Sequence, residues 1–162
     1  MTGRVDDVII QTASRLLVPH IQLYALYVLA HGHGSPGGGF QGGCILAASF
    51  ILMVIAYDLQ EVKRRIKETV IILLCSVGVF LFAWTGWMCL FVGGNFLDYG
   101  QLSAIIPTNQ VMARYYGIAV IETGVQITVM AVMVLIFLEL ATGGVHREIT
   151  EDTDAGTAGR QL

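Results

Sequence analysis

Apolar residues along the chain gather into four long runs that are separated by shorter polar segments. We predict that these runs are membrane-spanning helices at about residues 8–30, 43–59, 69–92 and 116–141. A helix rises roughly 1.5 Å per residue, so the shortest run covers about 25 Å, close to the thickness of the hydrocarbon core of a bilayer. The pattern therefore predicts an all-α integral membrane protein with a four-helix membrane domain over residues 1–141.

The basic residues of the loops indicate how the predicted helices are oriented. Four of the nine basic residues lie in the segment 58–68, between the second and third runs. Loops rich in Lys and Arg stay on the cytoplasmic side of a membrane. We therefore predict that this segment and both termini are cytoplasmic, and that the loop between the first two helices faces outward. Residues 142–162, which are rich in Thr, Gly and acidic residues, are predicted to form a disordered cytoplasmic tail.

Composition supports a multi-pass protein of the cell membrane. Of the 162 residues, 55% are hydrophobic and only 13% are charged, whereas soluble domains carry about 25% charged residues. No basic cluster apart from the one in 58–68 is present, so nucleic-acid binding is not expected. The three cysteines lie in apolar runs without a CxxC pattern, which argues against a disulfide framework or a zinc site. Because Asp6 and Asp7 precede the first run, we interpret it as a membrane span and not as a cleaved leader.

The loop predicted between the first two helices is unusually rich in glycine. Residues 31–43 read HGHGSPGGGFQGG, and seven of these thirteen residues are glycine. Pro36 removes a backbone donor and disfavours continuous helix, while glycine allows another chain to approach closely. We therefore predict a structured loop that packs at the membrane surface or against protein. Its candidate subunit-interface residues are His33, Pro36, Gly37, Gly38, Gly39, Phe40, Gly42 and Gly43. The alternative for the glycines is a purely architectural role in the loop.

Glu122 places a carboxylate well inside the fourth run, and Gln126 follows one helical turn further along. A carboxylate within a bilayer is energetically costly, so it must be neutralised, paired or in contact with water. One interpretation is a proton or cation relay, for which Glu122 and Gln126 are candidates. The alternative is a structural carboxyl group that forms a hydrogen bond with a neighbouring subunit.

The C-terminal half of the first run carries one polar stripe. His20, Tyr24, Tyr27 and His31 follow one another at spacings of four, three and four residues, which places them on one helix face. Imidazole titrates near physiological pH, so the stripe is a candidate proton path. The alternative is a structural role, in which a neutral histidine is satisfied by a hydroxyl or carbonyl group.

The pair His31 and His33 does not define a metal site. The HxH spacing supplies two ligands, whereas a zinc site needs three or four. The glycine-rich segment also lacks the lysine and the spacing of a phosphate-binding loop. No catalytic arrangement is identifiable in the sequence, so we expect no metal, no other cofactor and no enzymatic activity.

The string at 31–43, followed by the apolar CILAA at 44–48, closely resembles the B subunit of the Mrp (Mnh) multisubunit Na+/H+ antiporters. The preceding LVP at 17–19 and YALYVLAH at 24–31 are also similar to the first helix of that family. The resemblance is strong over residues 15–57 and looser over the later helices. It implies an accessory membrane subunit that contributes to assembly and to the cation and proton path of a larger complex.

The resemblance also implies partners and ions. The partners are the other membrane subunits of a large hetero-oligomeric complex in the lipid membrane, and the transported ions are Na+ and H+. The same module occurs in ferredoxin-driven membrane-bound hydrogenases and sulfur-reducing complexes, so membership of such a redox-driven complex stays open. Two other classes also stay open: a purely structural membrane scaffold subunit, and a stand-alone membrane enzyme or metal site built on His31 and His33.

Overall fold

The computed structural model describes residues 3–32, 34, 36–57, 67–105 and 107–158, with side chains described between residues 8 and 142. These residues contain no strand. Their elements are α1 (Gly3–Ala30), α2 (Gly39–Tyr57), α4 (Glu68–Phe91), a short 3-10 helix η1 (Tyr99–Ala104) and α5 (Gln110–Ala158). The prediction of an all-α fold is confirmed for the described part of the chain.

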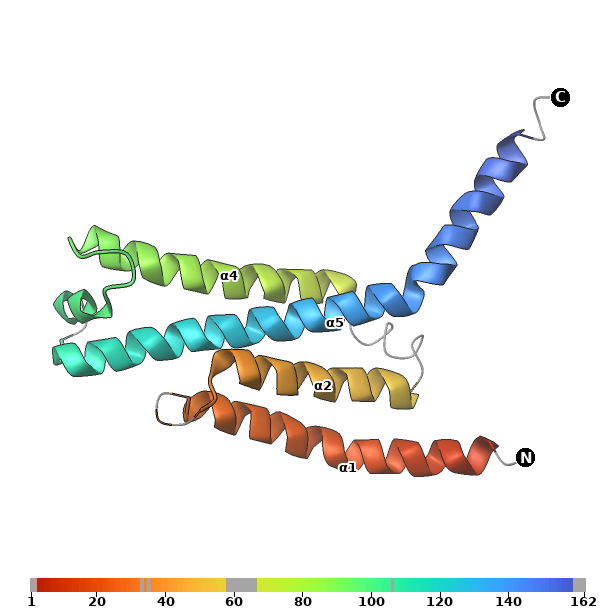
Figure 1. Ribbon diagram of the computed structural model, residues 1–162, viewed down its shortest axis with the longest axis horizontal. Helices are drawn as coiled ribbons and strands as arrows, with labels where there is room; N and C mark the ends of the chain where they lie inside the picture. Colours follow the sequence, from red (N-terminus) through yellow and green to blue (C-terminus); the bar gives the residue numbers. More distant parts are fainter. Residues whose placement is uncertain (1–2, 33, 35, 58–66, 106, 159–162) are drawn as a thin grey trace.

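Helix α5 is the central element of the bundle (Figure 1). α4 lies along one side of α5 and α2 along the other, while α1 packs on the far side of α2. α1 and α2 run antiparallel to each other, as do α4 and α5. The glycine-rich segment after α1 therefore brings the start of α2 against the middle of α5.

Three helical stretches of the described chain are long and apolar enough to cross a membrane: Gly39–Tyr57, Glu68–Phe91 and Gln110–Thr142. α1 is not among them, because polar residues such as Arg15 and His20 lower its hydropathy. Three of the four predicted spans therefore coincide with helices that have the length and composition of membrane spans. A fourth span formed by α1 stays a prediction.

Glycine residues bring α4 and α5 into close contact. A methyl group added to Gly78 would lie 2.6 Å from the carbonyl oxygen of Gly124, and one added to Gly124 would lie 2.9 Å from the carbonyl oxygen of Gly78. The Thr128 hydroxyl donates to the same Gly124 carbonyl at 2.9 Å. Lipid supplies no hydrophobic driving force for helix pairing, so membrane helices associate through such small residues.

The main hydrophobic core joins α2, α4 and α5. Its buried members are Ala47, Val54, Ile71, Ala131, Val134 and Leu138. Many large apolar side chains on the outside of the same helices are exposed, among them Phe80, Trp87 and Leu140. An exposed apolar surface of this extent is typical of contact with lipid or with other proteins.

Helix α2 begins at Gly39, earlier than the predicted start at residue 43. Gly39, Gly42 and Gly43 are buried against neighbouring helices, and this packing outweighs the low helix propensity of glycine. Pro36 precedes the helix, where its missing donor breaks no helical hydrogen bond. Only the first part of the glycine-rich segment is therefore a loop, and the second part is the first turn of α2.

Helix α5 extends beyond the predicted span 116–141 at both ends. At its start, the Ala113 backbone N–H donates to the Asn109 carbonyl at 2.9 Å. At its other end the backbone stays helical to Ala158, where a disordered tail is predicted, and no proline interrupts it. This last part turns away from the other helices (Figure 1). Residues 58–66 of the basic segment lie outside the described residues, so the orientation in the membrane stays a prediction.

Candidate functional site

Glu122 lies where the glycine-rich segment crosses α5. A methyl group added to Gly32 would lie 2.6 Å from Glu122 Oε2, and one added to Gly38 would lie 2.9 Å from Glu122 Oε1. The carboxylate therefore lies between the residues that follow α1 and the residue that precedes α2. A side chain at Gly32 or Gly38 would meet the carboxylate in its present position, so the glycines let both stretches of backbone approach it closely.

The first turn of α2 packs directly on the backbone of α5. A methyl group added to Gly39 would overlap the Glu122 carbonyl oxygen, and one added to Gly43 would lie 2.9 Å from the Gln126 carbonyl oxygen. The N-terminal end of α2 is thereby held beside the Glu122 carboxylate. This end of a helix carries partial positive charge, which stabilises a nearby anion.

Gln126 joins α5 to α1 through a buried hydrogen bond. Its side chain is 3% exposed, and its Nε2 donates to the Ala25 carbonyl oxygen at 3.2 Å. Gly42 leaves space for this amide, because a methyl group there would lie 2.9 Å from Gln126 Nε2. Gln126 therefore crosses the gap between the two helices and fixes their spacing next to Glu122.

Glu122 lines two pockets. An open pocket of about 440 Å³ lies between the glycine-rich segment, the start of α2 and α5, and Pro36, Gly37 and Phe40 also line it. A second pocket of about 190 Å³ lies between the end of α1 and α5. Glu122 is the one residue common to the two linings. No described residue forms a hydrogen bond with its carboxylate, so the oxygens can take a proton, a cation or water.

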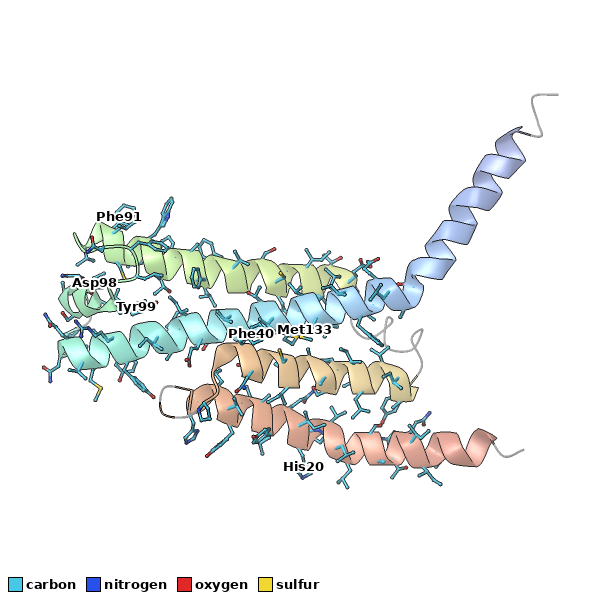
Figure 2. All side chains as sticks on the ribbon, viewed as in Figure 1. His20, Phe40, Phe91, Asp98, Tyr99 and Met133 are labelled. Carbon is cyan, nitrogen blue, oxygen red and sulfur yellow. The ribbon has the colours of Figure 1, made fainter. Side chains whose placement is uncertain are left out.

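The polar stripe of α1 lies on the outside of the bundle. Ring stacking shows that its members share a face, with centroids 6.4 Å apart for Tyr24 and Tyr27 and 4.1 Å apart for Tyr27 and His31. His20 points away from α2 and α5 (Figure 2). The opposite face of α1 is the buried one. The structure therefore places Glu122 and Gln126 at one site with the glycine-rich segment, and it places His20, Tyr24 and Tyr27 on a separate surface.

The predicted interface residues of the glycine-rich segment fall into two groups. Pro36, Gly37, Gly38 and Phe40 line the larger pocket, and the Phe40 side chain is 64% exposed, whereas Gly42 and Gly43 are buried between helices. His33 lies outside the described residues. Among the residues searched, no three His, Cys, Asp or Glu side chains converge to hold a metal ion.

Two residues of the site are absent from the sequence-based selection. Gly32 contacts Glu122, and Gln41 lies against Gly37 in the wall of the larger pocket. Both belong to the glycine-rich segment, so the composition of that segment was the feature of the sequence that could have identified them. Which of its residues reach Glu122 depends on how α2 packs against α5.

A second polar cluster lies in the loop between α4 and α5 (Figure 2). A methyl group added to Gly100 would lie 3.2 Å from Arg114 Nε and 3.4 Å from Asp98 Oδ1, so both charged side chains border the same glycine. Burial raises the pKa of the neighbouring Tyr99 phenol, and Cys89 raises it further. Tyr99 is therefore a neutral phenol at physiological pH, and we interpret the cluster as a structural closure of this end of the bundle.

The long apolar helices, their glycine contacts and a carboxylate inside one of them define an α-helical, multi-pass membrane protein. Residues 9–135 match the family model described as a domain related to the MnhB subunit of Na+/H+ antiporter. The chain is also 31% identical over 140 residues to the proteins named antiporter subunit mnhB2 in Staphylococcus aureus strains Newman, JH1 and COL, which covers 85% of this chain and 96% of each relative. The chain belongs to the MnhB family of Na+/H+ antiporter subunits. The resemblance seen in the sequence is thereby confirmed, and the family is one of antiporter subunits.

Proposed function

We propose that this chain is an accessory subunit of a multisubunit Na+/H+ antiporter in the cell membrane, and that Glu122 takes part in the path of the transported proton or cation. The proposed role of Glu122 in the ion path rests on the position of this residue. Its carboxylate lies against a glycine-rich backbone and lines two pockets, one between the glycine-rich segment and α5 and one between the end of α1 and α5.

The energetics favour a functional carboxylate at this place. Insertion scales put the cost of a charged side chain at the centre of a membrane helix at about 2.5–3.5 kcal/mol. The N-terminal end of α2 offsets part of this cost through its partial positive charge. A carboxylate kept without a hydrogen bond from the described residues, and open to both pockets, suits reversible binding of a proton or cation.

The exposed apolar surface supports a role inside a larger assembly. α4 and α5 expose rings and aliphatic side chains along their outer faces, among them Trp84, Phe91 and Ile136. Lipid covers such a surface, and so do membrane-spanning helices of other subunits. We propose that α1 completes a four-span domain in this setting, with its polar residues facing protein and not lipid.

The subunit composition tests the assignment to an antiporter. The chain is purified from its native membrane in mild detergent, and the proteins that remain bound are identified by mass spectrometry. We expect large antiporter subunits related to those of respiratory complex I, without iron–sulfur proteins. A bound iron–sulfur arm would instead place the subunit in a redox-driven complex, and recovery of the chain alone would contradict both assignments.

Accessibility to labelling tests the proposed orientation, in which both termini and residues 58–68 are cytoplasmic. After replacement of the three native cysteines by alanine, single cysteines are introduced at Val62 and, as a comparison site between α4 and α5, at Asn95. We expect a membrane-impermeant maleimide to label Asn95→Cys in intact cells and to label Val62→Cys only after permeabilisation. Labelling of Val62→Cys alone in intact cells would reverse the orientation.

A further inference from the structure

The outer face of α1 exposes polar side chains where a membrane helix would normally be apolar. We call the surface formed by His20, Tyr24 and Tyr27 the His20 face. Tyr24 is 58% exposed and Tyr27 is 56% exposed, and their rings stack with centroids 6.4 Å apart. The buried residues Val18 and Ala25 lie on the other side of the helix.

The hydrogen bond of His20 specifies what the face presents. His20 Nδ1 lies 2.7 Å from the Leu16 carbonyl oxygen. A carbonyl oxygen only accepts hydrogen bonds, so Nδ1 must carry the hydrogen. In the neutral form of the ring, Nε2 is then the acceptor, and the ring points away from the bundle (Figure 2). Within the described part of the chain, nothing donates to this nitrogen, and neither tyrosine hydroxyl has a hydrogen-bond partner.

This pattern does not suit lipid chains. Polar groups inside a membrane face protein or water-filled cavities, because acyl chains provide no hydrogen bond. A second copy of this chain does not suit it either. Two copies inserted in the same orientation and related by a two-fold axis along the membrane normal bring the two His20 rings to the same depth, so neither imidazole supplies the donor that the other lacks.

We infer that the His20 face binds a membrane-spanning helix of a different subunit, and that this helix donates a hydrogen bond to His20 Nε2. The inference rests on the proposed membership of a multisubunit antiporter and on the proposed span formed by α1. Beyond that membership, the inference specifies which surface of this chain makes the contact and which hydrogen-bonding group the partner must supply. The Glu122 site lies on a separate surface and plays no part in it.

Photo-crosslinking in the assembled complex tests the inference. A photo-reactive phenylalanine analogue is placed at Tyr24 and, as the control, at Leu26. Leu26 is 52% exposed and lies at a similar depth, but it points about 160° away from Tyr24 around the helix. We expect mass spectrometry to identify another antiporter subunit crosslinked at position 24 in higher yield than at position 26. Crosslinks at position 24 to lipid or to a second copy, or an equal yield at position 26, would overturn the inference.

Two substitutions test the hydrogen bond itself. His20→Gln keeps an acceptor near the place of Nε2, whereas His20→Leu removes it. Hydrogen bonds between membrane helices have measured strengths that correspond to about a three- to twentyfold change in an equilibrium. The partner identified by crosslinking is then followed in the complex without crosslinking. We expect His20→Leu to lower the amount of this partner that remains bound during detergent washing by this factor. With His20→Gln, we expect the bound amount to stay near the native level. Equal amounts of bound partner in the two variants would contradict the proposed hydrogen bond.

The outcomes separate this inference from the proposed function. If no antiporter subunit copurifies with the native chain, the proposed function fails. If the complex forms normally but position 24 crosslinks only to lipid, the proposed function stands and the assignment of the His20 face fails.

Discussion

Gly39→Ala is expected to prevent stable packing of α2 on α5. A methyl group at this position would overlap the Glu122 carbonyl oxygen, and backbone of the neighbouring helix cannot rotate away as a side chain can. Overpacking of a closely packed interface costs about 1–3 kcal/mol. The low helix propensity of glycine applies to helix interiors, whereas Gly39 is the first residue of α2, so we expect the loss to come from the contact with α5. Gly39→Val adds more volume and is expected to have a larger effect.

Gly34→Ala is the matched control for this prediction. Gly34 belongs to the same glycine-rich segment, but a methyl group added there has no neighbour within 4 Å. The measurement is the amount of each variant recovered in the membrane complex and the midpoint of its thermal unfolding. Equal recovery and equal midpoints for Gly39→Ala and Gly34→Ala would contradict the close contact between α2 and α5.

The sequence predicted the helices well because the apolar runs are long and the polar breaks between them are short. The helix starts were less predictable. Glycine has a low intrinsic helix propensity, so residues 39–42 resemble a loop until their packing against α5 is known. Such packing joins residues more than 80 positions apart, as the contact of Gly39 with Glu122 shows. No local pattern encodes a contact of that kind.

The candidate site was predictable in its parts and not in their grouping. Glu122 is conspicuous as a carboxylate in an apolar run, and the glycine-rich segment is conspicuous by composition. The spacing of His20, Tyr24 and Tyr27 correctly placed them on one face, but spacing does not tell which way a face points. The structure turns that face outward and places Gln126 inward, bonded to Ala25. The predicted proton-path residues therefore belong to two surfaces.

Glu122→Gln is expected to reduce antiport strongly while leaving the complex assembled. Glutamine has nearly the same shape as glutamate, but its amide does not exchange a proton or carry a charge in the physiological range. The substitution therefore preserves the contacts with Gly32 and Gly38 and removes the chemistry. If the carboxylate is part of the ion path, we expect a loss of at least about tenfold in transport rate, which corresponds to roughly 1.4 kcal/mol. The measurement is Na+-dependent proton movement in vesicles that contain the purified complex.

Glu139→Gln provides the matched control. Glu139 lies in the same helix α5, with an exposed side chain, and it lines neither of the two pockets that meet at Glu122. The same chemical change at this position is expected to leave antiport close to the native rate. Native antiport by an intact Glu122→Gln complex would contradict a role in the ion path and favour the structural scaffold. Because a neutral amide is cheaper to bury than a carboxylate, that scaffold should then be as stable as the native complex or more stable. The transport rate therefore distinguishes the two roles, because only a carboxylate that carries ions loses transport on this substitution while the complex stays intact.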